Sequence, residues 1–456
     1  MLFKSGNPYR GGLPQTVRLS PEDFTFQISK TNLDSINHVA KWTILVYMAA
    51  DCNLAEYLFD DLMEMKAIGS NPDVNICVLF DGPLLTDSFF ARLNQDTELE
   101  DDFIARFTDL WSIDQRVLKE IILDHTVLFP AERRLLILSG HGFGWKGVLQ
   151  DDFTWRQYLK RNAISMPPGD PALYCHQLAD LVKQSLPELK KRLNPEDKYK
   201  WSKFDIMALD ACNMGNLEAL SSWYDFTKIL IASENQEPGT GYPYDKILQK
   251  LKSSPGQDSV QLAEQLVRET KRSYGNSSES DTDLLITQVA FDCNRFPDFI
   301  NLTENLARVL AAYVASDGVE RIKTCIEGTY SFKEGFIDLK LFAGGLREGT
   351  FPAEVKKSAQ AWLDFFDRSG LLVASEVPDN PYLPKGLSIY LPPPEEFDEK
   401  YLEIVNSLPP GLRLWTWFLA TYYIGLLGSD AYKHPLVSTV FRSTVAMTKK
   451  EENRQE

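Results

Sequence analysis

Five short apolar runs alternate with helical stretches in the first half of the chain, and this alternation is the strongest constraint on the fold. The runs span residues 42–48, 74–80, 134–138, 205–209 and 229–232. Runs without polar alternation are typical of strands buried on both faces, and strands that alternate with helices indicate a parallel sheet. The stretch 54–66 repeats leucine with helical spacing, which predicts a helix that covers the sheet. We therefore expect an α/β fold with a mostly parallel central sheet.

The second half of the chain predicts a different architecture. One strand is expected over 284–291, and helices are expected over 299–315, 352–366 and 414–427. At 456 residues with 44% hydrophobic residues, the chain exceeds an average domain and can build two cores. We expect a C-terminal α+β domain packed on the α/β domain. The predicted organisation is an N-terminal extension (1–40), the α/β domain (41–255), the C-terminal domain (256–428) and a partly disordered tail (429–456).

Two glycine-containing motifs follow two of the predicted strands. The first runs from Ser139 through His141 to Trp145, and the second runs from Asp210 through Cys212 to Gly215. Because the carboxyl ends of parallel strands meet at one edge of the sheet, we expect the histidine and the cysteine to face the same crevice. An imidazole can take the proton of a thiol near neutral pH. The motifs therefore predict a cysteine nucleophile, Cys212, with a histidine general acid/base, His141.

Backbone and carboxylate groups complete this predicted site. The N–H groups of Gly142 and Cys212 are candidate oxyanion donors, and the loss of one such donor typically costs about 3 to 4 kcal/mol of barrier. Asp210 lies two residues before Cys212 and projects to the same side of an extended chain. It could orient His141 or line the pocket for the substrate residue before the scissile bond. We favour the pocket, where a partly buried carboxylate selects Arg or Lys.

The motifs resemble the clostripain family of cysteine endopeptidases, within the caspase-like group. The caspase histidine lies about 50 residues before its cysteine, whereas here 212 − 141 = 71 residues separate the two, so an insertion lies between them. The segments 41–51, 232–241, 335–339 and 386–392 are also similar to family features, and the resemblance covers roughly 41–425. Cys52 stands where the family's pattern has Asn, and the tail after Gly428 matches no family feature.

The resemblance implies a caspase-like αβα sandwich and cleavage of peptides or proteins after Arg, or Lys. Cys212 attacks, His141 protonates the leaving amine and Asp210 meets the basic side chain. The loop 232–241, with Glu234, is similar to the loop that completes the family's specificity pocket. Self-cleavage between the dyad residues is also implied, and the candidate points are Arg156, Lys160 and Arg161. Some relatives respond to calcium, although the sequence has no EF-hand loop and no required cofactor or metal ligand set is expected.

Composition bounds the partners and the location. The net charge of −16, from 48 basic and 64 acidic residues, disfavours binding to nucleic acid or to anionic lipid. No Cys-x-x-Cys pair is present, and no apolar run reaches the roughly 20 residues that span a bilayer. The first forty residues lack the apolar stretch of a signal sequence. We therefore expect a monomeric cytoplasmic protein without nucleic-acid or membrane partners.

Two other function classes stay open. The first is a catalytically silent caspase-like scaffold or binding protein, against which the intact Cys212 and His141 argue. The second is an amidase that acts on small molecules, and the lack of a Gly-x-Ser-x-Gly elbow counts against its serine version. The other cysteines and histidines lack comparable flanking motifs, so we expect them to be packing or surface residues.

Overall fold

The structure is a computed structural model of the chain. It describes residues 38–84, 87–107, 128–152, 203–275 and 285–440, together with the short pieces 25–26, 110, 119, 172–173, 175–177, 180 and 183–184. These residues form two compact units that are discontinuous in sequence. The first contains residues up to 215, 223–293 and 373–377, and the second contains 216–222, 294–372 and 378 onward.

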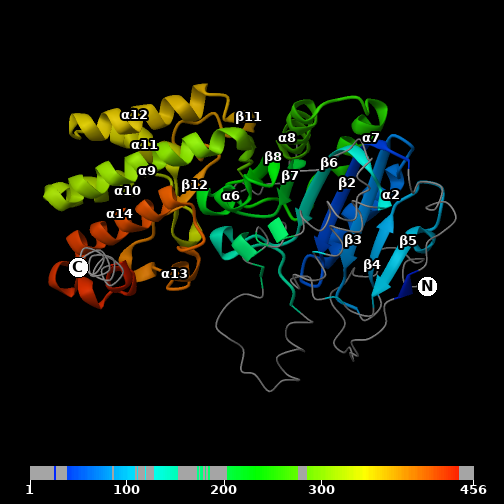
Figure 1. Ribbon diagram of the computed structural model, residues 1–456, viewed down its shortest axis with the longest axis horizontal. Coiled ribbons are helices and arrows are strands. Elements are labelled where there is room, and N and C mark those ends of the chain that lie inside the picture. Colours follow the sequence, from blue (N-terminus) through cyan, green and yellow to red (C-terminus); the bar gives the residue numbers. More distant parts are fainter. Residues whose placement is uncertain are drawn as a thin grey trace, which may run out of the picture. The chain divides into compact units, whose positions relative to one another are not determined.

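A ten-stranded sheet forms the centre of the first unit (Figure 1). The strand order is β1-β5-β4-β3-β2-β6-β7-β8-β9-β11. The five predicted strands are its middle, and neighbours among them are parallel. Their bounds are Ala40–Ala49 (β2), Val74–Asp81 (β3), Ala131–Ser139 (β6), Phe204–Asp210 (β7) and Thr227–Ser233 (β8). The prediction of an α/β fold with a mostly parallel sheet is confirmed.

Several strands outside this parallel core run antiparallel to their neighbours. The strands β4, β5 and β9 each pair antiparallel. The outer strands are Thr25–Phe26 (β1), Ser88–Arg92 (β4), Phe103–Phe107 (β5), Gln288–Asp292 (β9) and Leu372–Glu376 (β11). Only β9 was expected, within 284–291. The strands β4 and β5 were missed because their five-residue sequences, SFFAR and FIARF, carry no recognisable turn pair between them.

Three helices cover one face of the sheet (Figure 1). They are Ala55–Ile68 (α2), Tyr244–Ser253 (α7) and Ser259–Gly275 (α8). Leu58 and Leu62 of α2 pack in one core with alternate residues of β2, such as Ile44 and Val46. The intervening residue Leu45 faces the other side and is also fully buried. Burial of both faces explains why these strands are continuously apolar.

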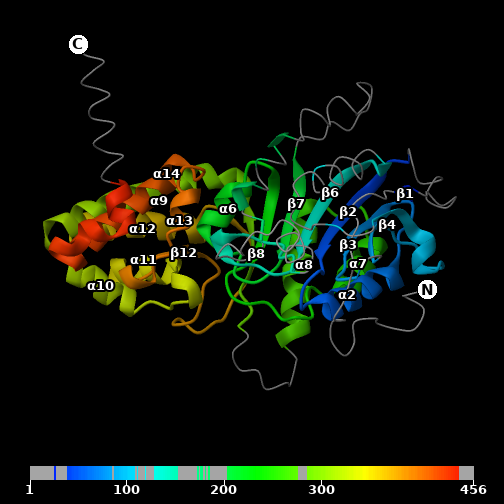
Figure 2. The same ribbon diagram turned by 90° about the horizontal axis from the view of Figure 1, so that it is seen from below.

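The second unit consists of helices and one small antiparallel pair of strands. The strands are Phe336–Asp338 (β10) and Ser388–Tyr390 (β12). The helices are Leu217–Trp223 (α6), Phe296–Tyr313 (α9), Val319–Glu327 (α10), Leu339–Glu348 (α11), Ala353–Arg368 (α12), Tyr401–Ile404 (α13) and Pro410–Leu427 (α14). The helices α9, α12 and α14 lie side by side (Figure 2), with Trp362 and Trp415 among their buried residues.

The three helices expected in the second half correspond to α9, α12 and α14. The predicted domain boundary after residue 255 stays a prediction, and contacts group α8 and β9 with the first unit. Within the part of the chain that the structure describes, no helix has the length and apolar character needed to cross a bilayer.

Candidate active site

The two predicted catalytic residues follow neighbouring parallel strands in register. Ser139, the last residue of β6, pairs with Asp210, the last residue of β7. The N–H of Gly140 donates to the carbonyl oxygen of Asp210 at 3.2 Å, which extends the pairing beyond the strands. His141 and Cys212 each come two residues after this pair. The topology therefore brings both to adjacent positions at the carboxyl edge of the sheet.

Gly142 fits closely against the loop that carries the nucleophile. A Cβ atom at this position would overlap the carbonyl oxygen of Cys212 and would lie 3.0 Å from the Ala211 Cβ. Only a residue without a side chain allows this approach of the two backbones. The predicted oxyanion donor Gly142 thus lies directly beside the residue that carries the thiol.

The thiol of Cys212 contacts the loop after β8. The N–H of Glu237 donates to the sulfur at 3.3 Å, and the sulfur lies 3.8 Å from the Glu237 carbonyl oxygen. Burial raises the pKa of the Cys212 thiol, and the negative charge of Asp210 adds to the increase, whereas the Glu237 N–H lowers it. A thiol in this environment is protonated at neutral pH, so its nucleophilicity depends on a base that takes the proton.

His141 contacts a residue that the sequence analysis did not single out. Its Nε2 lies 2.5 Å from the side-chain oxygen of Asn53, which follows the neighbouring strand β2. The ring also lies 5.9 Å from the ring of Phe143, centroid to centroid. Because 88 residues separate Asn53 from His141 in sequence, the pairing could be found only from the fold.

Asp210 is buried and receives three hydrogen bonds through one carboxylate oxygen. Tyr244 donates its hydroxyl at 2.8 Å, Ser139 its hydroxyl at 3.1 Å and Tyr242 its backbone N–H at 3.3 Å. Burial raises the pKa of the Asp210 carboxyl despite these bonds, each of which lowers it. Asn53 is one partner of His141, and Asp210 accepts hydrogen bonds from Ser139, Tyr242 and Tyr244. The predicted pocket role of Asp210 stays a prediction.

Two further carboxyl groups lie beside Asp210, and we call the three the acidic cluster: Asp61, Asp210 and Glu237. A Cβ atom at Gly241 would lie 2.6 Å from Asp61 Oδ2 and 2.9 Å from Asp210 Oδ2, so both carboxylates face one point. Burial, followed by the charge of Asp210, raises the pKa of Asp61 and of Glu237 well above the ordinary value. Among the described residues, no basic side chain forms an ion pair with any member of the cluster.

Two members of the acidic cluster, Asp61 and Glu237, were not predicted from the sequence as site residues. Asp61 belongs to the predicted helix 54–66, and only 3% of it is exposed. No feature of the sequence distinguishes it from Asp60, because its partners come from distant segments. Glu237 lies in the loop 232–241 that the resemblance singled out, but Glu234 was chosen there. Glu234 is buried with its backbone against Gly215, and its predicted role in substrate binding stays a prediction.

The remaining predicted site residues are the three candidate points of self-cleavage. Arg156, Lys160 and Arg161 lie outside the described part of the chain. Across the residues described, no group of three or more His, Cys, Asp or Glu side chains has the arrangement of a metal site. The expectation about calcium stays a prediction.

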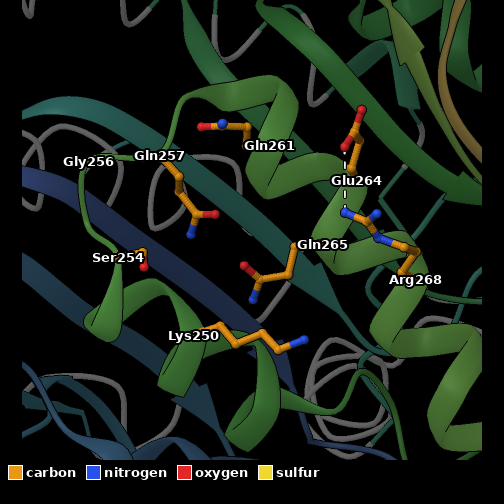
Figure 3. A pocket seen from close by; sticks show the side chains of 8 residues that line it. All are labelled: Lys250, Ser254, Gly256, Gln257, Gln261, Glu264, Gln265 and Arg268. Atoms are coloured by element: carbon orange, nitrogen blue, oxygen red, sulfur yellow. Dashed lines mark ion pairs between the residues drawn. The ribbon is translucent and has the colours of Figure 1, made fainter.

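A separate hollow of about 740 Å³ opens between α7 and α8 (Figure 3). It is lined by Lys250, Ser254, Gly256, Gln257, Gln261, Glu264, Gln265 and Arg268, which include none of the predicted site residues. Arg268 pairs with Glu264 at 3.5 Å, and Lys250 pairs with Glu269. These charges are mutually compensated, in contrast to those of the acidic cluster.

Comparison with known proteins identifies relatives of this chain. The profile of the Clostripain family matches residues 46–334. Clostripain of Hathewaya histolytica is 23% identical over 254 residues, which are 50% of this chain and 45% of that protein. The chain thus matches about half the length of this curated relative.

Two solved structures have a similar fold. One is a secreted C11 cysteine protease from Bacteroides thetaiotaomicron in complex with an irreversible peptide inhibitor, with a TM-score of 0.57 at 16% identity. The other is an inactive zymogen C11 protease from Parabacteroides distasonis, with a TM-score of 0.55 at 17% identity. Each comparison covers 83% of this chain and 99% of the other. The predicted caspase-like fold class is confirmed.

The extent of the family match and the strand register agree on the same two residues. It spans more than half of the residues and contains both His141 and Cys212. The strand register places these two residues at one edge of the sheet. The chain belongs to the clostripain family.

Proposed function

We propose that this protein is a cysteine endopeptidase that cleaves peptide bonds after Arg or Lys. The observation that carries the proposal is the acidic cluster beside a cysteine at the carboxyl edge of a parallel sheet. Asp61, Asp210 and Glu237 are buried without a compensating basic partner among the described residues. Burial without a counterion raises the pKa of these carboxyl groups, and a cationic substrate side chain supplies the counterion that favours their ionised form.

The proposed reaction begins with transfer of the Cys212 proton to His141. The sulfur attacks the carbonyl carbon of the scissile bond, and the N–H groups of Gly142 and Cys212 donate to the oxyanion. His141 returns the proton to the leaving amine as the C–N bond breaks, which leaves a thioester on Cys212. Water then attacks the thioester while His141 accepts its proton, and the acid product leaves as the proton returns to sulfur.

The cluster also bears on the choice of substrate side chain. A guanidinium presents five N–H donors in a planar fork, whereas an ammonium is a compact point charge. Three carboxylates on separate elements can surround a guanidinium and accept from several of its N–H groups. We therefore propose a preference for Arg over Lys in the position before the cut.

Self-cleavage between His141 and Cys212 is part of the proposal, with Arg156, Lys160 and Arg161 as the points to examine. Mass spectrometry of the purified protein, compared with the Cys212→Ala variant, tests this directly. A chain cut after one of these residues in the active protein and intact in the variant is the expected result. An intact active protein would exclude a requirement for self-cleavage.

A peptide panel tests the proposed function. Fluorogenic peptides that differ only before the cut, with Arg, Lys, citrulline or Leu, are assayed with calcium and with a chelator. We expect turnover of Arg and Lys peptides, none with Cys212→Ala, and little with citrulline, which keeps the shape of Arg without its charge. Turnover by Cys212→Ala would contradict the mechanism, and equal rates for Arg and citrulline would contradict the role of the cluster.

The alternative is a catalytically silent caspase-like scaffold. A silent scaffold predicts that the Cys212 thiol is alkylated no faster than another equally buried cysteine thiol of the chain. Burial raises the pKa of Cys325 to about 12, and this thiol is partly exposed like that of Cys212, so Cys325 is a suitable internal reference. Selective alkylation of Cys212 near neutral pH supports the peptidase, and uniform slow alkylation of all cysteines supports the scaffold.

A further inference from the structure

Three adjacent strands each deliver one polar side chain to the same edge of the sheet. The strand order places β2 next to β6 and β6 next to β7. Asn53 follows β2, His141 follows β6 and Cys212 follows β7. Met48 of β2 pairs with Ser139 of β6, so the turn after β2 lies beside the histidine loop.

The turn that carries Asn53 is fixed by backbone hydrogen bonds. The N–H of Cys52 donates to the Ala50 carbonyl at 2.7 Å, and the N–H of Ala55 donates to the Cys52 carbonyl at 3.3 Å. The N–H of Asp152, beyond the histidine motif, donates to the Asp51 carbonyl at 2.7 Å. The position of Asn53 relative to His141 is therefore set by ordered backbone on both sides.

The side chain of Asn53 does not serve the helix that follows it. Asn residues near the start of a helix commonly accept hydrogen bonds from its first N–H groups. The N-cap of α2 is Leu54, and no side chain caps this helix. The Asn53 side-chain oxygen lies instead 2.5 Å from His141 Nε2. A structural role in the helix does not account for this contact.

We propose that Asn53 is the positioning residue for His141, an inference that rests on the proposed peptidase function. An amide oxygen accepts, so the bond requires the proton of the neutral imidazole to be on Nε2. The lone pair then lies on Nδ1, which is the nitrogen that takes the Cys212 proton. Asn53 thus selects the tautomer, fixes the ring plane and accepts a hydrogen bond from the imidazolium that forms.

The amide suits this role better than a carboxylate would in such an acidic site. The acidic cluster already disfavours the Cys212 thiolate, because the charge of Asp210 raises the pKa of the thiol. A neutral acceptor orients the ring without adding negative charge. Loss of a hydrogen bond to a charged group lowers turnover by about tenfold or more.

The test compares Asn53→Ala and Asn53→Asp with the unaltered protein and with each change in a His141→Ala background. Turnover of an Arg peptide is resolved into kcat and KM, and alkylation of Cys212 by iodoacetamide is followed from pH 5 to 9. Thermal unfolding of each variant controls for folding. The unaltered protein and Cys212→Ala are assayed alongside, so the peptidase proposal is judged separately from the role of Asn53.

We expect Asn53→Ala to lower kcat about tenfold with KM changed less than twofold and an unchanged unfolding temperature. The pH of half-maximal alkylation rises in Asn53→Ala, because the imidazolium loses its hydrogen-bond acceptor, and it also rises in Asn53→Asp, because the added negative charge disfavours the thiolate. In the His141→Ala background Asn53→Ala leaves the alkylation profile unchanged. Unchanged kcat in Asn53→Ala, or the same loss with and without His141, would overturn the inference.

Discussion

Replacement of Glu218 by Gln should make folding of the second unit more stable, and increasingly so as the pH rises. Glu218 of α6 is 2% exposed. One of its carboxyl oxygens accepts from the Tyr390 backbone N–H at 3.1 Å and from the Tyr401 hydroxyl at 3.2 Å, and the other has no hydrogen-bond partner among the residues that the structure describes. Burial raises the pKa of Glu218 from 4.5 to about 7. The folded protein therefore holds this group protonated under conditions in which the unfolded chain ionises it.

The size of the effect follows from this difference in pKa. Below pH 4.5 the carboxyl is protonated in both states, and its ionisation costs nothing. Between pH 4.5 and 7 only the unfolded chain releases the proton, so stability falls with rising pH by about 1.4 kcal/mol for each unit. The total is about 3 kcal/mol, reached at pH 7 and kept above it. Gln keeps the accepting oxygen but does not titrate, so the unfolding free energy of the variant does not fall with pH through this group.

Urea denaturation followed by tryptophan fluorescence at pH 5, 6, 7 and 8 measures the effect. Glu403→Gln, an exposed position in the same unit, is the matched control. We expect the difference in unfolding free energy between Glu218→Gln and the unaltered protein to grow by about 2.5 kcal/mol between pH 5 and pH 8, with no such trend for the control. A difference independent of pH would refute the reasoning, because the other buried carboxyls are common to both proteins.

Three further changes test the site. Asp210→Asn should lower kcat/KM for Arg peptides by about a hundredfold, yet increase the rate of Cys212 alkylation, because the Asp210 charge raises the pKa of the thiol; a decrease in both would contradict the pocket role. Glu237→Gln should raise KM for Arg peptides more than KM for citrulline peptides. Glu234→Gln, which changes a nearby carboxyl group outside the acidic cluster, is the control. Gly142→Ala should lower kcat at least a hundredfold with the fold retained by circular dichroism, because the new Cβ overlaps the Cys212 carbonyl; near-normal turnover would argue against the placement of the oxyanion donors.

The central strands were predictable because their burial on both faces leaves a continuous apolar pattern. The adjacency of the His141 and Cys212 loops followed from parallel topology alone, since successive strand ends share an edge. The outer strands β4 and β5 lack such a pattern. Arg92 at the end of β4 is buried through hydrogen bonds to Asn75 and Asn94, which no local sequence rule indicates.

The polar partners of the site were less predictable because they come from distant segments. Asp61 lies on α2, 149 residues before Asp210, and has the same local surroundings in sequence as its exposed neighbour Asp60. Asn53 reaches His141 across 88 residues. The two units are also interleaved, since residues 216–222 join the second unit directly after the cysteine loop. A sequence pattern can place residues on an element, but contacts between elements require the fold.

Covalent capture of Cys212 tests the central claim most directly. Two peptidyl chloromethyl ketones that differ only in the residue next to the reactive group, Arg or norleucine, are incubated with the protein, and the modified residue is located by mass spectrometry. We expect modification of Cys212, at least a hundredfold faster with the Arg reagent than with the norleucine reagent, and no modification by either reagent in Cys212→Ala. Equal rates for the two reagents, or attachment elsewhere in the chain, would contradict it.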